Sequence, residues 1–327
     1  MAAGDKSDFV IYHEQFFGGF SEALEQESNI FNAASASSIQ LRPNRLKGDY
    51  EQESFLQNIG SLITRRDTAS IAAATDLPKT QDEFIGVKVN RKIGPVAQTR
   101  DAFRKIARDP AEMSFLLGAQ AGKAVSVEMA NTAVACLGAA LTSFYSGGMV
   151  YDGTAGTPTH NGLVNTMKLL GDAATGIAAW VMHSKSYYDL VGQAITDKVY
   201  EVAGMTIYTG SVPTLGKPVV VMDSANLVES GTPDQYRILG LVPGACIIDE
   251  SEEQEIVTDT VTGLENLVTR IQGEYAYNIK IRGTKWDTTN GGENPNDAAL
   301  ALSTNWDDVM AAANAGKGGP GVMGRFD

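Results

Sequence analysis

The sequence predicts an α+β protein that combines one long buried helix with many short strands. Residues 110–145 have the pattern of a long helix, which ends at the run Ser146-Gly147-Gly148. Later in the chain, short apolar runs are separated by Gly, Pro and Asp turns, which is typical of strands. The 327 residues are 43% hydrophobic and 20% charged, enough for one large or two ordinary domains.

Residues 1–60 predict an extended arm rather than a compact domain. Residues 9–20 are aromatic and interrupted by glycine, and residues 21–34 predict a short helix with Ser21 as its N-cap. The polar stretch that follows contains Pro43 and favours an extended chain. Aromatic side chains that cannot bury themselves locally have to pack on the rest of the chain or on a neighbour.

Residues 65–100 predict a long excursion that resembles a β-hairpin and is basic in its second half. Residues 84–90 (FIGVKVN) alternate apolar and polar side chains, which is the period of a strand with one buried face. Pro95 has no N–H to donate, so we expect it to take the chain out of any central ladder.

The helix over residues 110–145 starts with a strong signal, because Asp109 is suited to the N-cap and Pro110 to the first helical position. At 1.5 Å per residue, roughly 36 residues span ~54 Å. After the first turn its only charges are Lys123 and Glu128, so we expect most of its circumference to be covered. Three glycines weaken the helix but allow another backbone to come close, namely Gly118, Gly122 and Gly138.

The uncharged residues 129–151 are long enough to cross a membrane, since a spanning helix needs about 20 apolar residues. They are rich in Ala, Gly, Ser and Thr rather than Leu and Ile, and no basic anchor flanks them. We therefore expect a buried helix and no membrane partner. The first residues, MAAGDKSDF, do not have the pattern of a signal peptide.

The second half of the chain predicts a mixture of helices and strands. A helix over residues 162–174 is followed by a buried strand at 180–182 and a helix over 185–195, with Ser184 as N-cap. The tail from residue 286 is rich in Asn, Gly and Asp and predicts loose order, apart from a short helix over 306–313. Other candidate strands are residues 206–208, 218–223, 236–242, 245–249, 255–261, 264–275 and 276–282.

The net charge of −13 is unevenly distributed along the chain. An acidic chain is a poor general binder of nucleic acid, because Lys and Arg supply the affinity for phosphates. The uneven charge fits two solvated faces, or alternatively two surfaces that meet between copies of the same chain. The residues expected to make such contacts are Lys88, Arg91, Lys92, Arg100, Arg104, Lys105 and Arg108 on the basic side and Glu250, Glu252, Glu253 and Glu255 on the acidic side.

None of the candidate motifs carries an enzyme signature. Residues 118–123 (GAQAGK) lack the spacing and the following Ser or Thr of a phosphate loop. His183 and Ser184 have no G-x-S-x-G elbow, which favours a packed histidine beside an N-cap. Residues 249–255 lack the calcium-loop pattern and favour a solvated acidic loop or a charged sheet edge. We predict no catalytic residue, no cofactor and no metal site.

The two cysteines, Cys136 and Cys246, lie far apart in the sequence and fit neither a CxxC nor a zinc pattern. Two thiols without a disulfide framework indicate a reducing compartment. We expect both to be buried as small hydrophobic residues.

Six stretches of the chain carry a resemblance to a known family. They are VIYHEQFFGGF, TQDEFIGVKVNRKIGPVAQT, RDPAEMSFLLG, AAWVMHSKSYYDLVGQAI, LVPGACIIDESEE and VTGLENLVTRIQGEYAYNIKIRGTKWDTTNGG. In order and texture they resemble the major capsid protein of tailed bacteriophages, whose shell fold is named after the Hong Kong 97 phage. The resemblance implies pentamers and hexamers of identical subunits that form an icosahedral head around double-stranded DNA.

The resemblance also implies how the chain is divided. Residues 1–60 would be the N-terminal arm, and residues 61–108 an extended loop that lies on a neighbouring subunit. Residues 109–150 and 256–327 would form a peripheral domain with the spine helix, and residues 151–255 an axial domain. The location implied is the virion, after assembly in the cytoplasm of the host bacterium.

Two departures from that family bear on the partners. Many members carry a long helical N-terminal scaffolding region, which this sequence does not show, so a separate scaffolding protein is expected beside a portal and a decoration protein. Contact with packaged DNA is expected to be non-specific. Some members cross-link a loop Lys to an Asn of a neighbour. Lys79, Lys88, Lys92, Asn290 and Asn294 are present here, but their spacing singles out no pair.

Two alternatives stay open at this point. The shell of a cellular nanocompartment, similar to an encapsulin, would have the same fold but would enclose enzyme cargo instead of DNA. A soluble α+β enzyme would need a pocket with converging polar groups, and no motif in the sequence predicts one.

Overall fold

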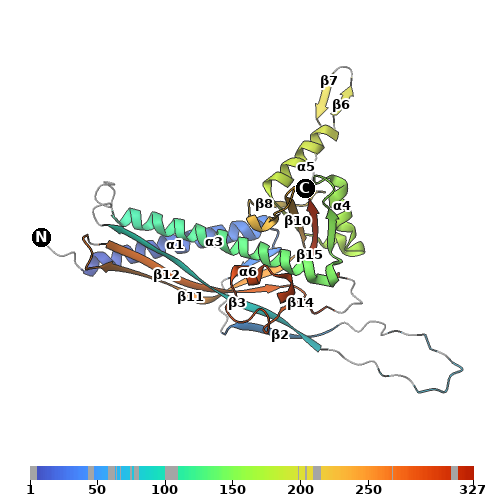
Figure 1. Cartoon of the computed structure of the whole chain (residues 1–327), viewed down its shortest axis with the longest axis horizontal. Coiled ribbons are helices and arrows are strands. Elements are labelled where there is room, and N and C mark those ends of the chain that lie inside the picture. The colour runs from blue at the N-terminus through green and yellow to red at the C-terminus, as the bar shows by residue number, and fades with distance from the viewer. Residues whose placement is uncertain are drawn as a thin grey trace.

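The computed structural model is an elongated α+β structure with two larger sheets, both of which contact the long helix α3 (Pro110–Ser143) (Figure 1). The predicted α+β class is confirmed. A separate hairpin of β6 (Val199–Val202) and β7 (Met205–Tyr208) projects from the body. The structure describes residues 6–42, 48–57, 63, 65–66, 68–73, 76, 81–99, 110–197, 199–202, 205–208, 215–266, 268–310 and 316–327.

The first sheet has seven strands and is built around a long antiparallel ribbon of three. The two strands predicted at residues 245–249 and 255–261 form one strand, because register shifts around Glu252 let pairing continue through the acidic run. In spatial order the strands are β1 (Ile39–Arg42), β11 (Cys246–Val261), β12 (Val268–Ile281), β3 (Gln81–Thr99), β13 (Thr284–Trp286) and β14 (Trp306–Asp308), and β2 (Tyr50–Leu56) also pairs with β3.

The prediction that Pro95 leaves the ladder is wrong, since β3 continues to Thr99. Ile93 pairs with Gly273 and Val96 with Ile271, so two residues of β3 stand opposite one residue of β12. This irregularity accommodates the missing N–H. Among the described strands, none pairs with the other edge of β3 at this point, and an edge strand tolerates proline.

The N-terminal segment differs from the predicted extended arm with a short helix. Helix α1 (Lys6–Ala34) is 29 residues long and packs along α3, with Phe16 and Phe20 buried between them. The predicted close approach of another backbone is confirmed at Gly118 and Gly122, where an added Cβ would lie 2.0 Å from the Phe16 carbonyl oxygen and 2.7 Å from that of Phe20. It is wrong at Gly138, where the nearest atoms belong to the Arg237 side chain. The first two glycines therefore allow close packing of two helices.

Helix α3 confirms the predicted long helix, and a 3₁₀ turn at Phe144–Gly147 ends it. Within the described part of the chain, one helical stretch, Ser114–Gly147, is long and apolar enough to cross a membrane, and 78% of its most apolar window is buried in the protein. Packing inside the fold thus accounts for its apolar character. The predicted N-cap, Asp109, lies outside the described residues.

The second sheet has six strands and is flanked by two helices. The helix predicted at residues 162–174 is shorter than expected, because a 3₁₀ segment at Gly171–Gly176 replaces its second half. The strands are β4 (Val150–Gly153), β15 (Gly321–Phe326), β10 (Gln235–Leu241), β5 (Ala179–Met182) and β8 (Val219–Val221), with β9 (Val228–Glu229) beside β10, and the helices are α4 (His160–Lys168) and α5 (Ser184–Asp197).

The prediction of a loosely ordered tail is wrong. Trp286 and Trp306 are buried against each other, with ring centroids 4.9 Å apart, and they anchor the segment between them. Asn296 caps α6 (Asp297–Leu300) and accepts a hydrogen bond from the Ala299 N–H. Trp306 starts a strand instead of the predicted helix, and residues 311–315 lie outside the described part.

A strand from the end of the chain lies in the same sheet as strands of the predicted axial domain. Strand β15, which the family resemblance groups with the long helix, pairs with β10 and β4 in the second sheet. The domain boundaries stay a prediction.

Candidate assembly surfaces

The basic residues predicted to contact a neighbour have different environments on β3. Lys88 is only 9% exposed, whereas Lys92 is exposed on the same face of the strand. Arg91 points to the opposite face, toward α3, where it forms ion pairs within its own chain. The remaining basic residues of that prediction lie outside the described part of the chain, namely Arg100, Arg104, Lys105 and Arg108.

The acidic residues lie in β11. Glu250 is half-buried and Glu255 is exposed, whereas the side chains of Glu252 and Glu253 are outside the described part. Strand β1 pairs with β11 only as far as Asp249, and no other described strand covers that edge, as expected for a charged sheet edge. Strands β11 and β3 flank β12, so the two charged segments are about 10 Å apart across one strand. Contact between them in different copies stays a prediction.

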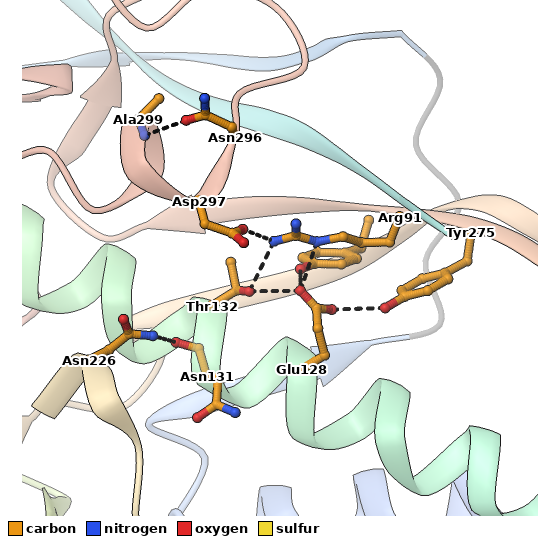
Figure 2. Close-up of polar contacts among 10 residues, drawn as sticks. Arg91, Glu128, Asn131, Thr132, Asn226, Tyr275, Asn296, Asp297 and Ala299 are labelled. Carbon is orange, nitrogen blue, oxygen red and sulfur yellow. Dashed lines mark hydrogen bonds and ion pairs between the residues drawn. The ribbon is translucent and has the colours of Figure 1, made fainter. Parts of the chain in front are cut away.

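Glu128 of α3 is the centre of a polar network that the sequence did not predict (Figure 2). Its carboxylate accepts hydrogen bonds from the hydroxyls of Tyr275 at 2.9 Å and Tyr277 at 2.8 Å, both from β12. It also lies 2.8 Å from Nε of Arg91, and Arg91 in turn pairs with Asp297 of α6. One carboxylate therefore ties the ribbon to the long helix, and Arg91 extends the link to the tail.

The protonation of the network is set by burial and charge. Burial, and then the nearby Glu128 carboxylate, raise the pKa of Tyr275 and Tyr277 well above the ordinary value, so both hydroxyls remain donors. Burial lowers the pKa of Arg91, but its hydrogen bonds to Asp297 and Tyr277 outweigh this and raise it. The one signal in the sequence was the rarity of charge in α3, where Glu128 is one of two charges after the first turn.

A groove of about 630 Å³ lies beside this network, between α3 and β3. Its other walls come from β12, α6 and the 3₁₀ turn Ala225–Leu227. Ala124 and Val127 supply apolar surface, and Val127 is 59% exposed. Lys123 adds positive charge, and its side chain is 65% exposed. Lys92 also borders the groove, but its side chain points to the face of β3 away from α3. The groove is therefore apolar at Ala124 and Val127 and basic at Lys123.

The His183-Ser184 pair is a helix start and not a nucleophile with its base. The prediction that Ser184 is the N-cap is wrong by one residue, because His183 has that role. The His183 carbonyl accepts the first helical hydrogen bond, from the Tyr187 N–H, and the His183 Nδ1 accepts one from the Lys185 N–H. The Ser184 side chain and backbone N–H both bond to Asp223, which lowers the pKa of that carboxyl. These bonds fix the start of α5 against the second sheet.

A buried polar row crosses the first sheet, with Asp249, Asn278 and Lys88 at paired positions of three strands. Asp249 is 4% exposed, and its Oδ1 has no hydrogen-bond partner. Burial, and then the Glu51 carboxylate, raise the pKa of Asp249. A carboxyl whose pKa is raised on folding lowers stability once pH exceeds its unfolded-state pKa.

Asp249→Asn is therefore expected to stabilise the chain at neutral pH, because it removes a charge that folding disfavours. The gain should disappear as pH falls below the ordinary Asp range, where Asp249 is protonated in both states. Thermal unfolding at a series of pH values measures this difference. A variant that is less stable than the parent at pH 7 would contradict the assignment.

Cys136 and Cys246 are both free and buried, as predicted. Burial raises the pKa of the Cys246 thiol to about 12 and that of Cys136 well above its ordinary value, so both are poor nucleophiles. Among the described residues, no group of three or more His, Cys, Asp or Glu side chains is placed to hold a metal ion.

Comparison with known proteins gives one family and a set of similar folds. The model of the Gp13-like family, described as major capsid protein 13-like, matches residues 8–323. A structure from Mycobacterium phage Cain has a TM-score of 0.52 at 9% identity, with 90% of each chain covered. The cyanophage Pam1 capsid asymmetric unit gives 0.51 at 12% identity, with 88% of each chain covered. A search of the curated proteins found no relative.

A third structure, from Microbacterium phage Oxtober96, gives a TM-score of 0.51 at 10% identity over 76% of this chain and 84% of its own. At such identities the structural similarity shows the fold alone, and the predicted capsid fold is confirmed. The family match and the fold point to a structural role rather than an enzymatic one. The chain belongs to the Gp13-like family of major capsid proteins.

Proposed function

We propose that the chain assembles into pentamers and hexamers and that these build the closed icosahedral head of a tailed phage around double-stranded DNA. The observation that carries this proposal is the family match over residues 8–323. Head-to-tail contacts between identical subunits close into rings, and many weak contacts per subunit act together in a shell.

Exposed apolar side chains on the outlying parts of the body support this proposal. Ile63 and Ile71 are 94% and 104% exposed, and both lie in the segment between β2 and β3. Tyr188 on α5 is 68% exposed. Large apolar side chains in projecting segments are typical of surfaces that another molecule covers. We propose that residues 61–108 act as the loop that lies on a neighbouring subunit.

The partners follow from the same role. We propose a separate scaffolding protein, a portal and a decoration protein, with assembly in the cytoplasm of the host bacterium and a final location in the virion. The net charge of −13 disfavours adhesion to packaged phosphates, so contact with DNA is non-specific.

We also propose that the basic segment of β3 and the residues after it meet the acidic edge of β11 in another copy. Opposite charges that are exposed at such a contact attract less strongly as salt rises. Assembly intermediates should therefore form less readily at high salt than at low salt, as measured by sedimentation. Equal assembly at both salt concentrations would refute this pairing.

Negative-stain electron microscopy of the purified chain, with sedimentation alongside, tests the proposed function. Closed shells or five- and six-membered rings are the expected result, with DNA in particles made during infection. Shells that instead contain enzyme cargo would favour a cellular compartment. A monomer or dimer under all salt conditions, and also after co-expression with the scaffolding protein of the same phage, would refute the proposal.

A further inference from the structure

We propose that the groove between α3 and β3 is a socket for a second copy of this chain, and that its occupant is the end of the β11–β12 hairpin, residues 257–265. This inference rests on the proposed assembly into a shell and names two surfaces that would meet in it. Residues of the network in Figure 2 form part of the walls of this socket.

The groove is a formed site with uncovered apolar surface. Its volume of about 630 Å³ lies in the range of pockets that enclose a drug-sized ligand, and it can therefore hold several side chains. Val127 is 59% exposed, although 78% of the most apolar window of its helix is buried. The bonds of Glu128 to Tyr275 and Arg91 hold three walls in place, so an occupant need not order them.

The charge at the groove selects an acidic occupant. The Lys123 side chain is 65% exposed and lies 3.8 Å from the carboxylate of Glu27. Arg91, at the same groove, is paired with Glu128 and Asp297. In a chain with a net charge of −13, an exposed lysine at the groove favours an acidic occupant. Complementary charge steers a partner and fixes its register.

The end of the β11–β12 hairpin has the matching chemistry. Val257 and Leu264 are 55% and 56% exposed, so this end carries apolar side chains that its own chain leaves uncovered. Asp259 and Glu265 are exposed beside them. The hairpin forms one end of the elongated body, where it is available to another molecule (Figure 1). Apolar side chains would enter the groove while the Glu265 carboxylate faces Lys123.

A chain cannot fill its own groove with this hairpin end. Tyr275 lines the groove, and β12 runs extended from there back to Val268, a distance of about 23 Å at 3.3 Å per residue. Leu264 precedes Val268 in the sequence and therefore lies beyond that end of β12. The occupant must therefore come from another copy, which makes the contact head-to-tail and compatible with a closed ring.

A pair of introduced cysteines tests the contact directly. In assembled particles, the double variant Val127→Cys with Leu264→Cys should form a ladder of covalent oligomers on mild oxidation, read on a non-reducing gel. The buried native thiols do not compete. The matched control joins Val127→Cys with Val164→Cys, since Val164 is 46% exposed on α4, away from the hairpin. This control should stay monomeric on the gel.

A charge exchange provides the second test. Lys123→Glu and Glu265→Lys should each lower the yield of assembled particles by about tenfold, and the two together should restore it. Particles that form normally but give no ladder above the control, with no rescue by the double exchange, would overturn this inference and leave the proposed function intact. A parent chain that never assembles would overturn both.

Discussion

Gly118→Ala is expected to force α1 away from α3 and to destabilise the chain by about 2–3 kcal/mol. A Cβ at this position would lie 2.0 Å from the carbonyl oxygen of Phe16, which belongs to the backbone of another helix. The clash has to outweigh the gain of roughly 1 kcal/mol that Ala brings to a helix in place of Gly. Chemical unfolding of unassembled subunits, followed by circular dichroism, measures the change.

Gly192→Ala is the matched control for this experiment. Gly192 is also helical, in α5, and a Cβ there would meet nothing within 4 Å. This variant should be as stable as the parent or more stable by up to about 1 kcal/mol. If Gly118→Ala behaves like Gly192→Ala, the contact between α1 and α3 does not exist as described.

Glu128→Leu is expected to destabilise the subunit by roughly 2–3 kcal/mol, below the range for a fully buried pair because the Glu128 side chain is 29% exposed. The change leaves the Arg91 guanidinium and the hydroxyls of Tyr275 and Tyr277 without their shared acceptor. The double variant Arg91→Met with Glu128→Leu should cost less than the sum of the two single changes, because the one charge it leaves without a partner, Asp297, is 78% exposed.

The same unfolding measurement separates loss of the Glu128 network from the loss of an ordinary exposed ion pair. Asp172→Asn removes the acidic partner of Lys317 in an exposed pair and serves as the control, with no measurable change expected. Additive costs for Arg91→Met and Glu128→Leu would show that the two residues do not act together.

The elements that the sequence predicted best depend on local patterns. The alternation in residues 84–90 and 274–282 indicates strands of one sheet, and the start signal at Pro110 indicates the long helix. These patterns work because each strand or helix buries one face, and burial leaves a periodic trace in the sequence.

Predictions that depended on glycine as a helix breaker, or on amino-acid composition, were wrong because contacts between distant segments determine the structure there. The glycines after Phe17 contributed to the prediction of an extended arm, but Gly19 lies in a continuous helix and allows close contact, since a Cβ there would lie 2.4 Å from the Phe115 carbonyl oxygen. The Asn- and Gly-rich tail suggested loose order, but two buried tryptophans, Trp286 and Trp306, hold it. Such tertiary contacts leave no local signal.

The polar network and the groove could not be predicted from the sequence. Arg91, Glu128, Tyr275 and Asp297 come from four elements and meet only because the ribbon packs on α3 and the tail returns to it. The charge asymmetry of the chain was visible, but the sequence did not indicate that Arg91 is paired within its own subunit. Because these residues are far apart in the sequence, no short motif with a fixed spacing contains them.

Image reconstruction by cryo-electron microscopy of particles formed by the chain tests the proposed assembly into a shell. We expect closed icosahedral shells in which each subunit has the two sheets and the long helix of Figure 1, with hairpin density from a neighbour in the groove beside α3. Particles without rings of five and six subunits, or a chain that stays monomeric when its scaffolding protein is present, would contradict it.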